Sequence, residues 1–260
     1  MCLMKRFILL LRYCKRIIER LFRVRIHGYP STIIQIIPDK HGGRAWFSYE
    51  ATLRTIIEQY QIDLILDVGA NKGQFALETR KFYKGSIISF EPVLNTFNIL
   101  QSTASHDSSW FVYNYALGNK SEEDYINIHE NDKLSSFLEI NREYSDVVRD
   151  KGKTQTKELI KIRRFDDIVE EMPVNVYARK ILLKLDTQGY DLEVYKGTER
   201  IRDSILAIQS EVYHVPIYSQ APNWIEIIDK YRKDGYRFVG LYPLIRRGLF
   251  SISSDCLMVK

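Results

Sequence analysis

Residues 63–75 read DLILDVGANKGQF, an apolar run that stops at Asp67 and continues into two glycines separated by three residues. A short apolar run bounded by turn-forming residues predicts a buried strand that leads into a helix. The glycines allow backbone N–H groups to approach a ligand closely, and Asp67 supplies a carboxylate beside them. This stretch therefore predicts a site at the end of a strand for a ligand that carries positive charge.

Segments with strand and helix patterns alternate from residue 49 to the end of the chain. The predicted strands of the sheet are 64–68, 86–90, 110–114, 180–185, 206–212, 237–242 and 255–259. The predicted helices are 49–60, 73–84, 94–104, 191–197 and 224–234. This rhythm is typical of an α/β fold with a Rossmann-like sheet. We expect a mostly parallel sheet with an antiparallel last strand.

The basic residues are concentrated in the first 26 positions. This segment holds eight Lys and Arg side chains against Glu19, so residues 27–260 carry about −2 of the formal charge of +5. That distribution argues against a nucleic-acid groove on the main domain, and we expect no nucleic-acid partner. Three scattered cysteines predict neither a disulfide framework nor a zinc site, which favours a cytoplasmic location.

Apolar residues recur at helical spacing from Leu3 to Leu21, and basic residues fall on the opposite side, which predicts an amphipathic basic helix. Its longest apolar run is too short for a membrane span or a signal peptide. Residues 1–26 either contact an anionic membrane peripherally or pack against the protein's own domain. We divide the chain into this helix with its linker (1–46) and a main domain (47–260), in which 119–171 form an inserted cap or flap.

The second predicted strand ends in Glu91 and Pro92, where a carboxylate can accept both hydroxyls of a ribose. The loop after the first strand has the spacing GxxxG and lacks the GxGxxG of dinucleotide sites, which disfavours a pyrophosphate ligand such as NAD. S-adenosylmethionine has a ribose, an ammonium and a sulfonium but no phosphate. It suits this pattern better than a dinucleotide does.

Eight blocks of sequence, in the right order, resemble the FkbM-type methyltransferases. The blocks are DVGANKGQF (67–75), FEP (90–92), NYALGN (114–119), LSSF (134–137), RFDDI (164–168), LLKLDTQGYDLEVYKG (182–197), SEVYHVPIY (210–218) and SDCLMVK (254–260). The resemblance implies a class I methyltransferase fold and S-adenosylmethionine as donor. It also implies transfer to oxygen, often to a hydroxyl of a sugar, a glycan intermediate or a secondary metabolite.

The resemblance implies roles for single residues as well. The methionine part of the donor would be lined by Asp67, Gly69, Asn71 and Gly73. Glu91 would hold the ribose. The adenine would lie beside Asn114, Ala116 and Leu117, although Leu117 also fits plain core packing. Two serines of the insertion would either reach toward donor or acceptor or remain solvated loop residues: Ser135 and Ser136.

Lys184 and Asp186 fall on the same side of a predicted strand because side chains alternate along a strand. They either form a structural ion pair or leave Asp186 to position the acceptor hydroxyl, and the loop 187–189 favours the second interpretation. A hydroxyl must lose its proton as the methyl bond forms, so a base is required. Glu211 and His214 are further candidates, although members of the family commonly carry an apolar or small residue where His214 stands.

No dedicated metal site is predicted, because the chain lacks HExxH and its histidines are scattered. A divalent ion between Asp186 and Glu211 stays open as an alternative. Residues 186–189 read DTQG and lack the Asn/Asp-Pro-Pro-aromatic motif of nucleic-acid amino-methyltransferases. Two other functions remain open: a nicotinamide-dependent sugar oxidoreductase, which would also bind a ribose, and a non-catalytic membrane-associated partner.

Overall fold

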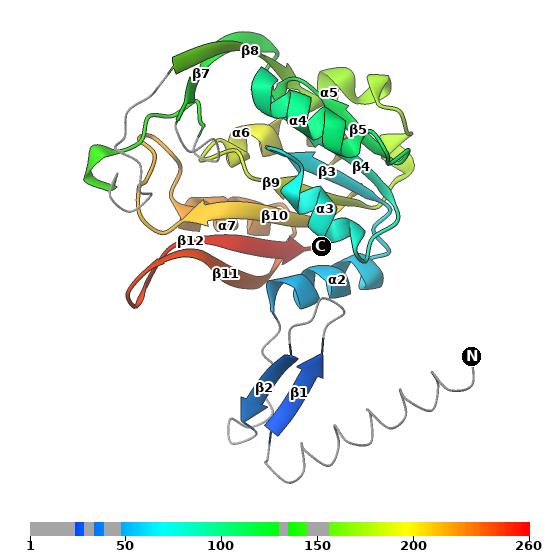
Figure 1. Ribbon diagram of the computed structural model, residues 1–260, viewed down its shortest axis with the longest axis vertical. Helices are drawn as coiled ribbons and strands as arrows, with labels where there is room; N and C mark the ends of the chain where they lie inside the picture. The colour runs from blue at the N-terminus through cyan, green and yellow to red at the C-terminus, as the bar shows by residue number, and fades with distance from the viewer. Residues whose placement is uncertain (1–23, 29–33, 39–47, 130–134, 145–155) are drawn as a thin grey trace. The chain divides into compact units, whose positions relative to one another are not determined.

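The computed structural model describes residues 24–28, 34–38, 48–129, 135–144 and 156–260 (Figure 1). The chain divides into two compact units, Met1–Thr52 and Leu53–Lys260. In the first unit, β1 (Val24–Gly28) pairs antiparallel with β2 (Ile34–Pro38). Helix α2 (Tyr49–Gln59) spans the division between the units. The amphipathic helix predicted from Leu3 to Leu21 lies outside the described residues.

A seven-stranded sheet forms the centre of the second unit, in the order β11-β12-β10-β9-β3-β4-β5. Its strands are β3 (Leu64–Val68), β4 (Ser86–Phe90), β5 (Trp110–Tyr113), β9 (Ile181–Leu185), β10 (Ile205–Tyr213), β11 (Arg237–Arg247) and β12 (Phe250–Val259). Neighbouring strands from β5 to β10 run parallel, whereas β12 is antiparallel to both β10 and β11. The predicted α/β class, with an antiparallel last strand, is confirmed.

Part of the predicted insertion forms a second, three-stranded sheet. It contains β6 (Ala116–Gly118), β7 (Glu122–Ile128) and β8 (Thr156–Arg164), with β8 in the middle. Strand β8 runs parallel to β6 and antiparallel to β7. Buried side chains of β6, β7 and β8 pack against Val93 at the end of the loop that follows β4. This packing places the inserted sheet beside the carboxyl end of the central sheet.

Helices cover both faces of the central sheet, as Figure 1 shows with α4 in front of the strands and α7 behind them. The helices are α3 (Gln74–Arg80), α4 (Leu94–Ala104), α5 (Phe165–Ile168), α6 (Asp191–Lys196) and α7 (Trp224–Lys233). Short 3-10 segments lie at Arg142–Tyr144, Val169–Glu171, Val176–Ala178 and Glu199–Ile201. Residues of α5, α6 and α7 share one apolar core with one face of the strands. None of the helices in the described part of the chain is long and apolar enough to cross a membrane.

The opposite face of the sheet carries a row of polar side chains in register across four strands. Asp67 on β3 is paired with Ser89 on β4 and with Lys184 on β9, which is paired in turn with Gln209 on β10. Ser89 Oγ donates to Asp67 Oδ2 at 3.1 Å and accepts from Trp110 Nε1 at 2.9 Å. Because buried polar groups need partners, the Asp67 carboxylate is held from both sides, by Ser89 of β4 and by Lys184 of β9.

The order of the strands locates the site. From β3 the chain proceeds outward through β4 to β5, and after the insertion it returns to β9 on the other side of β3. In open α/β sheets a ligand binds at such a switch point, outside the carboxyl ends of the strands. The loops after β3 and β9 therefore border the expected crevice.

Candidate active site

A cavity of about 410 Å³ lies at the carboxyl ends of β3, β4, β9 and β10. This volume is typical of a pocket for a small molecule or cofactor. Loops after these strands form most of its wall, Ala116 and Leu117 contribute from β6, and Ser135 and Ser136 contribute from the insertion. Leu244 of β11 also reaches the wall. The cavity thus draws on segments from more than half of the chain.

Gly69 is required by the close approach of β3 and β9. Its φ is +74°, in the left-handed region that favours glycine, and a Cβ placed there would lie 2.0 Å from the carbonyl oxygen of Asp186. Its N–H and that of Ala70 both donate to the carbonyl of Phe90. The sequence predicted that the backbone here approaches a ligand. In the structure, the close neighbours of the Gly69 backbone are the Asp186 carbonyl and the Phe90 carbonyl.

Asn71 and Gly73 shape the same loop in different ways. Asn71 has a φ of +48°, and its Oδ1 accepts from the N–H of Lys72 at 2.9 Å and from Gln74 Nε2 at 3.0 Å. A Cβ on Gly73 would lie 2.7 Å from the ring of Trp110, which lies outside the cavity wall. Asn71 therefore lines the cavity, and Gly73 instead permits the helix start to pack on β5.

Glu91 is buried at the cavity wall, and its carboxylate is held at both oxygens. Oε2 accepts from the N–H of Asn71 at 2.9 Å, and Oε1 accepts from the N–H of Val93 at 3.0 Å. Burial raises the pKa of Glu91 to about 7, although these two N–H groups and Lys184 lower it in part. Each oxygen retains a lone pair with which it can accept a hydrogen bond from a ligand.

The residues expected beside the adenine separate into two groups. Ala116 and Leu117 line the cavity, whereas Asn114 braces the loop after β4, since its Nδ2 donates to the carbonyls of Glu91 at 3.0 Å and Pro92 at 2.9 Å. Ser136 also has a bracing contact, because its Oγ donates to the carbonyl of Gln188 at 2.8 Å. Asn114 thus acts on the site through the position of Glu91.

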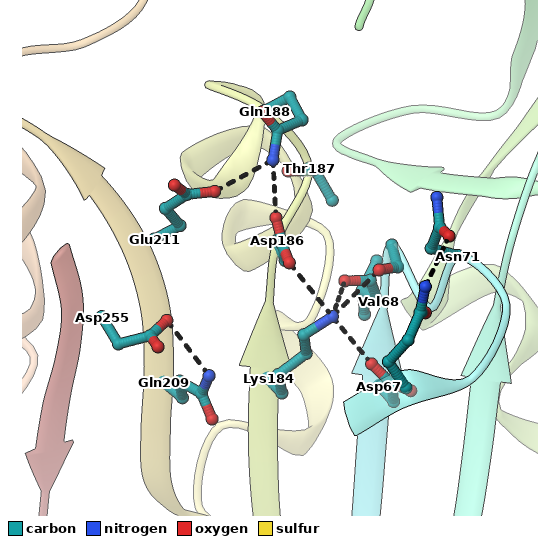
Figure 2. A network of polar contacts seen from close by, with 12 residues as sticks. Asp67, Val68, Asn71, Lys184, Asp186, Thr187, Gln188, Gln209, Glu211 and Asp255 are labelled. Atoms are coloured by element: carbon teal, nitrogen blue, oxygen red, sulfur yellow. Dashed lines mark hydrogen bonds and ion pairs between the residues drawn. The ribbon is translucent and has the colours of Figure 1, made fainter. Parts of the chain in front are cut away.

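Lys184 is buried and stands between two carboxylates, as Figure 2 shows. Its Nζ lies 2.9 Å from Asp67 Oδ1 and 3.7 Å from Asp186 Oδ2, and it donates to the carbonyl of Gly69 at 2.9 Å. Burial alone would lower the pKa of Lys184, but Asp67 and Asp186 raise it above its ordinary value. Asp67 was expected to line the cavity. The alternation along β3 instead buries its side chain beneath the wall, as the partner of Lys184.

Gln188 joins Asp186 to Glu211 at the open end of β9. Its Nε2 donates to Asp186 Oδ1 at 2.7 Å and to Glu211 Oε2 at 2.9 Å (Figure 2). Its Oε1 accepts from the hydroxyls of Tyr213 at 2.8 Å and Tyr218 at 2.6 Å. Because two hydroxyls occupy the amide oxygen, the amide nitrogen is directed at the carboxylates. The Asp186 side chain remains 41% exposed, which leaves it open to a ligand.

The two carboxylates beside Gln188 differ in environment. Burial and the nearby Asp186 raise the pKa of Glu211 well above its ordinary value, so Glu211 favours its protonated form. Asp255 lies on β12, the next strand of the sheet, and its carboxylate accepts from Gln209 Nε2 at 3.2 Å. Burial, and to a smaller extent the charge of Asp186, raises the pKa of Asp255 to about 7. Asp186 is therefore the most solvent-exposed of the three carboxylates, because Glu211 is buried and Asp255 is half-buried.

His214 lies apart from this group. Its Nε2 is 2.8 Å from Ser254 Oγ, and its ring is 5.0 Å from that of Trp224. The residue does not contribute to the cavity wall, and burial lowers its pKa. The next residue along β10 from Glu211 that faces the cavity is Tyr213, because side chains alternate along a strand. The geometry thus separates His214 from Asp186 and Glu211, with which it was grouped.

Within the described ranges, no group of three or more His, Cys, Asp or Glu side chains is arranged to hold a metal ion. A divalent ion between Asp186 and Glu211 is one alternative from the sequence. In the structure, the amide nitrogen of Gln188 lies between these two carboxylates. This donor satisfies one oxygen of each carboxylate.

The sequence model of the methyltransferase FkbM domain family matches residues 67–238 of this chain. The chain belongs to the FkbM methyltransferase family. Methyltransferase sdnD of Sordaria araneosa is 30% identical over 156 residues, which are 52% of this chain and 60% of that protein. The chain thus spans less than two thirds of that relative's length. The family description is that of a methyltransferase domain, and the match begins at Asp67, the residue at which the glycine-containing loop after β3 was recognised.

Solved methyltransferase structures are similar to this FkbM chain at low sequence identity. An rRNA methylase from Streptococcus thermophilus is 9% identical, with a TM-score of 0.43, over 84% of this chain and 99% of that one. Precorrin-6y C5,15-methyltransferase from Geobacter metallireducens GS-15 is 7% identical, with a TM-score of 0.43, over 86% and 96%. TYW2 of P. horikoshii, in complex with MeSAdo, is 12% identical, with a TM-score of 0.39, over 91% and 72%.

Sequence reasoning missed several contributors to the site of this FkbM protein, among them Gln188, Tyr213 and Leu244. Gln188 was treated only as part of a loop, although a glutamine before a glycine at the end of a strand is a signal of a strained turn, and its φ is +54°. Tyr213 and Leu244 carry no such signal. Their approach to the cavity depends on pairing between β10, β12 and β11, which distant segments of the chain supply.

Proposed function

We propose that this protein transfers the methyl group of S-adenosylmethionine to a hydroxyl oxygen of a sugar, a glycan intermediate or a similar small molecule. The observation that carries the proposal is the partly exposed carboxylate of Asp186, held by Gln188 and Lys184 at the end of β9. Unlike an amine, which can attack as a neutral donor, an alcohol gains from a base that takes its proton in the transition state. A fixed carboxylate facing the cavity suits that need.

The donor would occupy the half of the cavity between the loop after β3 and the loop after β4. Asn71 lines the cavity at the first of these loops, and Glu91 offers two oxygens to the ribose hydroxyls. Leu117 and Ala116 would contact the adenine. S-adenosylmethionine supplies a sulfonium methyl that an acceptor oxygen displaces in line. The residues present fit its parts, since carboxylates face the hydroxyls and apolar side chains face the ring.

The pair Asp186 and Glu211 would divide the proton chemistry. Glu211 is buried and favours its protonated form, whereas Asp186 is open to the cavity. Two titratable groups with such different environments are commonly an acid and a base in one site. We assign the base to Asp186, and we assign to Gln188 the task of holding its carboxylate in one orientation. Lys184 adds positive charge behind the carboxylate at 3.7 Å.

The acceptor class is tested by transfer of a deuterated methyl group. The full chain is incubated with labelled S-adenosylmethionine and a panel of saccharides, small alcohols, amines and RNA transcripts, and products are analysed by mass spectrometry and NMR. We expect an ether on a saccharide or alcohol oxygen. Transfer to an amine or to an RNA base instead would overturn the proposal of a hydroxyl acceptor, while leaving the methyltransferase assignment in place.

Binding of the donor is expected to strengthen as the pH rises from about 6 to about 8. The pKa of Glu91 is raised to about 7, so its carboxyl is protonated at the lower pH and ionised at the higher one. Only the ionised form accepts from both ribose hydroxyls, and affinity falls by up to about tenfold per pH unit below the pKa. Calorimetric titrations with S-adenosylmethionine across this range measure the effect.

Glu91→Gln should bind the donor more weakly by about 1–3 kcal/mol at high pH and should lose the Glu91 part of the pH dependence. Glu158→Gln is the matched control, because its carboxylate also accepts a backbone N–H, from Leu94 at 2.9 Å, but lies outside the cavity wall. Equal affinity and equal pH dependence in the wild type and Glu91→Gln would exclude Glu91 from the donor site.

A further inference from the structure

The hairpin formed by β11 and β12 ends in a tip that is both apolar and basic. Residues 244–250 read LIRRGLF. Leu249 is 88% exposed and Phe250 is 76% exposed, the two highest values among the large apolar side chains of the described residues. Burying such side chains is favourable, so an exposed pair at one turn indicates a contact surface. We call Arg246, Arg247, Leu249 and Phe250 the hairpin tip.

The charge of the hairpin tip is positive and uncompensated. Residues 237–254 contain three arginines and no Asp or Glu. Among the described residues, neither Arg246 nor Arg247 forms an ion pair; the one polar contact of Arg246 is a long bond of 3.4 Å to the carbonyl of Leu249. Two guanidinium groups that form no ion pair with the described residues, beside exposed Leu and Phe side chains, match an anionic surface that has an apolar layer beneath it.

The hairpin tip lies at the same edge of the sheet as the cavity. Strand β10 ends at Tyr213, which pairs with Ser253, so residues 245–252 extend past the carboxyl end of the neighbouring strand. Figure 1 shows this extension in red beyond β10. Leu244 is 52% exposed and also lines the cavity. The cavity wall thus reaches along β11 to within two residues of Arg246, where the hairpin tip begins.

We propose that the hairpin tip inserts into the headgroup region of an anionic membrane and holds the mouth of the cavity at that surface. A stable protein interface needs about 800 Å² per partner, whereas two side chains at a convex turn offer much less. The same two side chains suit shallow insertion into a bilayer, and the arginines suit anionic headgroups. The proposal concerns binding alone and does not depend on which acceptor is methylated.

The first test places a probe at the tip of the full chain. Phe250→Trp is mixed with vesicles of phosphatidylcholine and phosphatidylglycerol, some of whose phosphatidylcholine has brominated acyl chains, and fluorescence is compared with that of the wild type. Ile99→Trp is the control, because Ile99 is an exposed apolar residue of α4. We expect bromine to quench the added fluorescence of Phe250→Trp and not that of Ile99→Trp. Vesicle-bound protein without quenching at position 250, or no vesicle binding at all, would overturn the proposal.

The second test separates local contact from total charge. Arg246→Gln/Arg247→Gln should lower the partition coefficient by about thirtyfold, which follows from about 1 kcal/mol per basic residue at the surface. Arg232→Gln/Lys233→Gln removes the same charge from exposed positions on α7 and should have a much smaller effect. Equal losses in the two variants would contradict a contact at the tip. Leu249→Ser/Phe250→Ser should weaken vesicle binding and leave the sedimenting mass of the protein unchanged. A change in sedimenting mass with intact vesicle binding would contradict the proposal, because the tip would then join two copies of the chain.

Discussion

Asp186→Asn is expected to lower kcat for methyl transfer by roughly 100- to 10,000-fold, the usual contribution of a general base. The amide retains the shape of the side chain but cannot take the proton of the acceptor. Donor affinity should change little, because Glu91, which is assigned to the ribose, keeps its two backbone N–H partners. Steady-state kinetics and donor calorimetry on the same preparations measure the two effects separately.

Asp255→Asn is the matched control for this change, since it replaces a neighbouring carboxylate that bonds to Gln209 and does not line the cavity. We expect its kcat to remain close to that of the wild type. Glu211→Gln tests the division of roles: it should retain more activity than Asp186→Asn, because Glu211 favours its protonated form in the native protein. If Glu211→Gln were inactive while Asp186→Asn turned over normally, the base would be Glu211.

Lys184→Met should lower the free energy of unfolding by about 3–5 kcal/mol, the cost of removing one partner of a buried ion pair. Asp67 has no solvent exposure, and its Oδ1 lies 2.9 Å from the Lys184 ammonium group. Without that cation, a carboxylate would remain buried beneath the cavity with Ser89 as its hydrogen-bond donor. Urea unfolding followed by circular dichroism measures the loss.

Lys230→Met supplies the comparison, because Lys230 lies 2.7 Å from Asp234 in a pair whose side chains are 40% and 20% exposed. Removing this exposed pair should cost at most about 1 kcal/mol. The double variant Lys184→Met/Asp67→Asn should recover part of the loss, since no buried charge is then left alone. A Lys184→Met variant no less stable than Lys230→Met would mean that the buried pair contributes nothing to stability.

The central strands were predictable from local pattern. The predicted bounds of β3 and β4 agree with the structure, because each is a short apolar run closed on both sides by polar or turn-forming residues. The hairpin was predicted too short: β11 continues to Arg247 and β12 begins at Phe250. Past the last residue of β10, β11 and β12 pair only with each other. The sequence of this part of the hairpin does not alternate between apolar and polar residues, so it gives no strand signal.

The sequence also predicted which side chains share a face of one strand, but it did not predict which residues of other strands they contact. Alternation predicted that Lys184 and Asp186 share one side of β9, and the 3.7 Å between Nζ and Oδ2 agrees with it. Alternation also assigns Asp67 to one face of β3, but it does not reveal that Lys184 of β9 is the partner of its carboxylate. That outcome depends on which strand lies beside β3, and β9 is more than a hundred residues away in the chain.

The sequence by itself determined the family, because the residue blocks that mark it can be recognised along the chain without knowing how the strands are assembled. Only the tertiary structure decided the rest. It joined Gln188 to Asp186 and Glu211, separated His214 from them, and extended the hairpin of β11 and β12 past the end of β10. The physical reason is that hydrogen bonds act over about 3 Å, and their partners come from strands that meet only when the sheet is assembled.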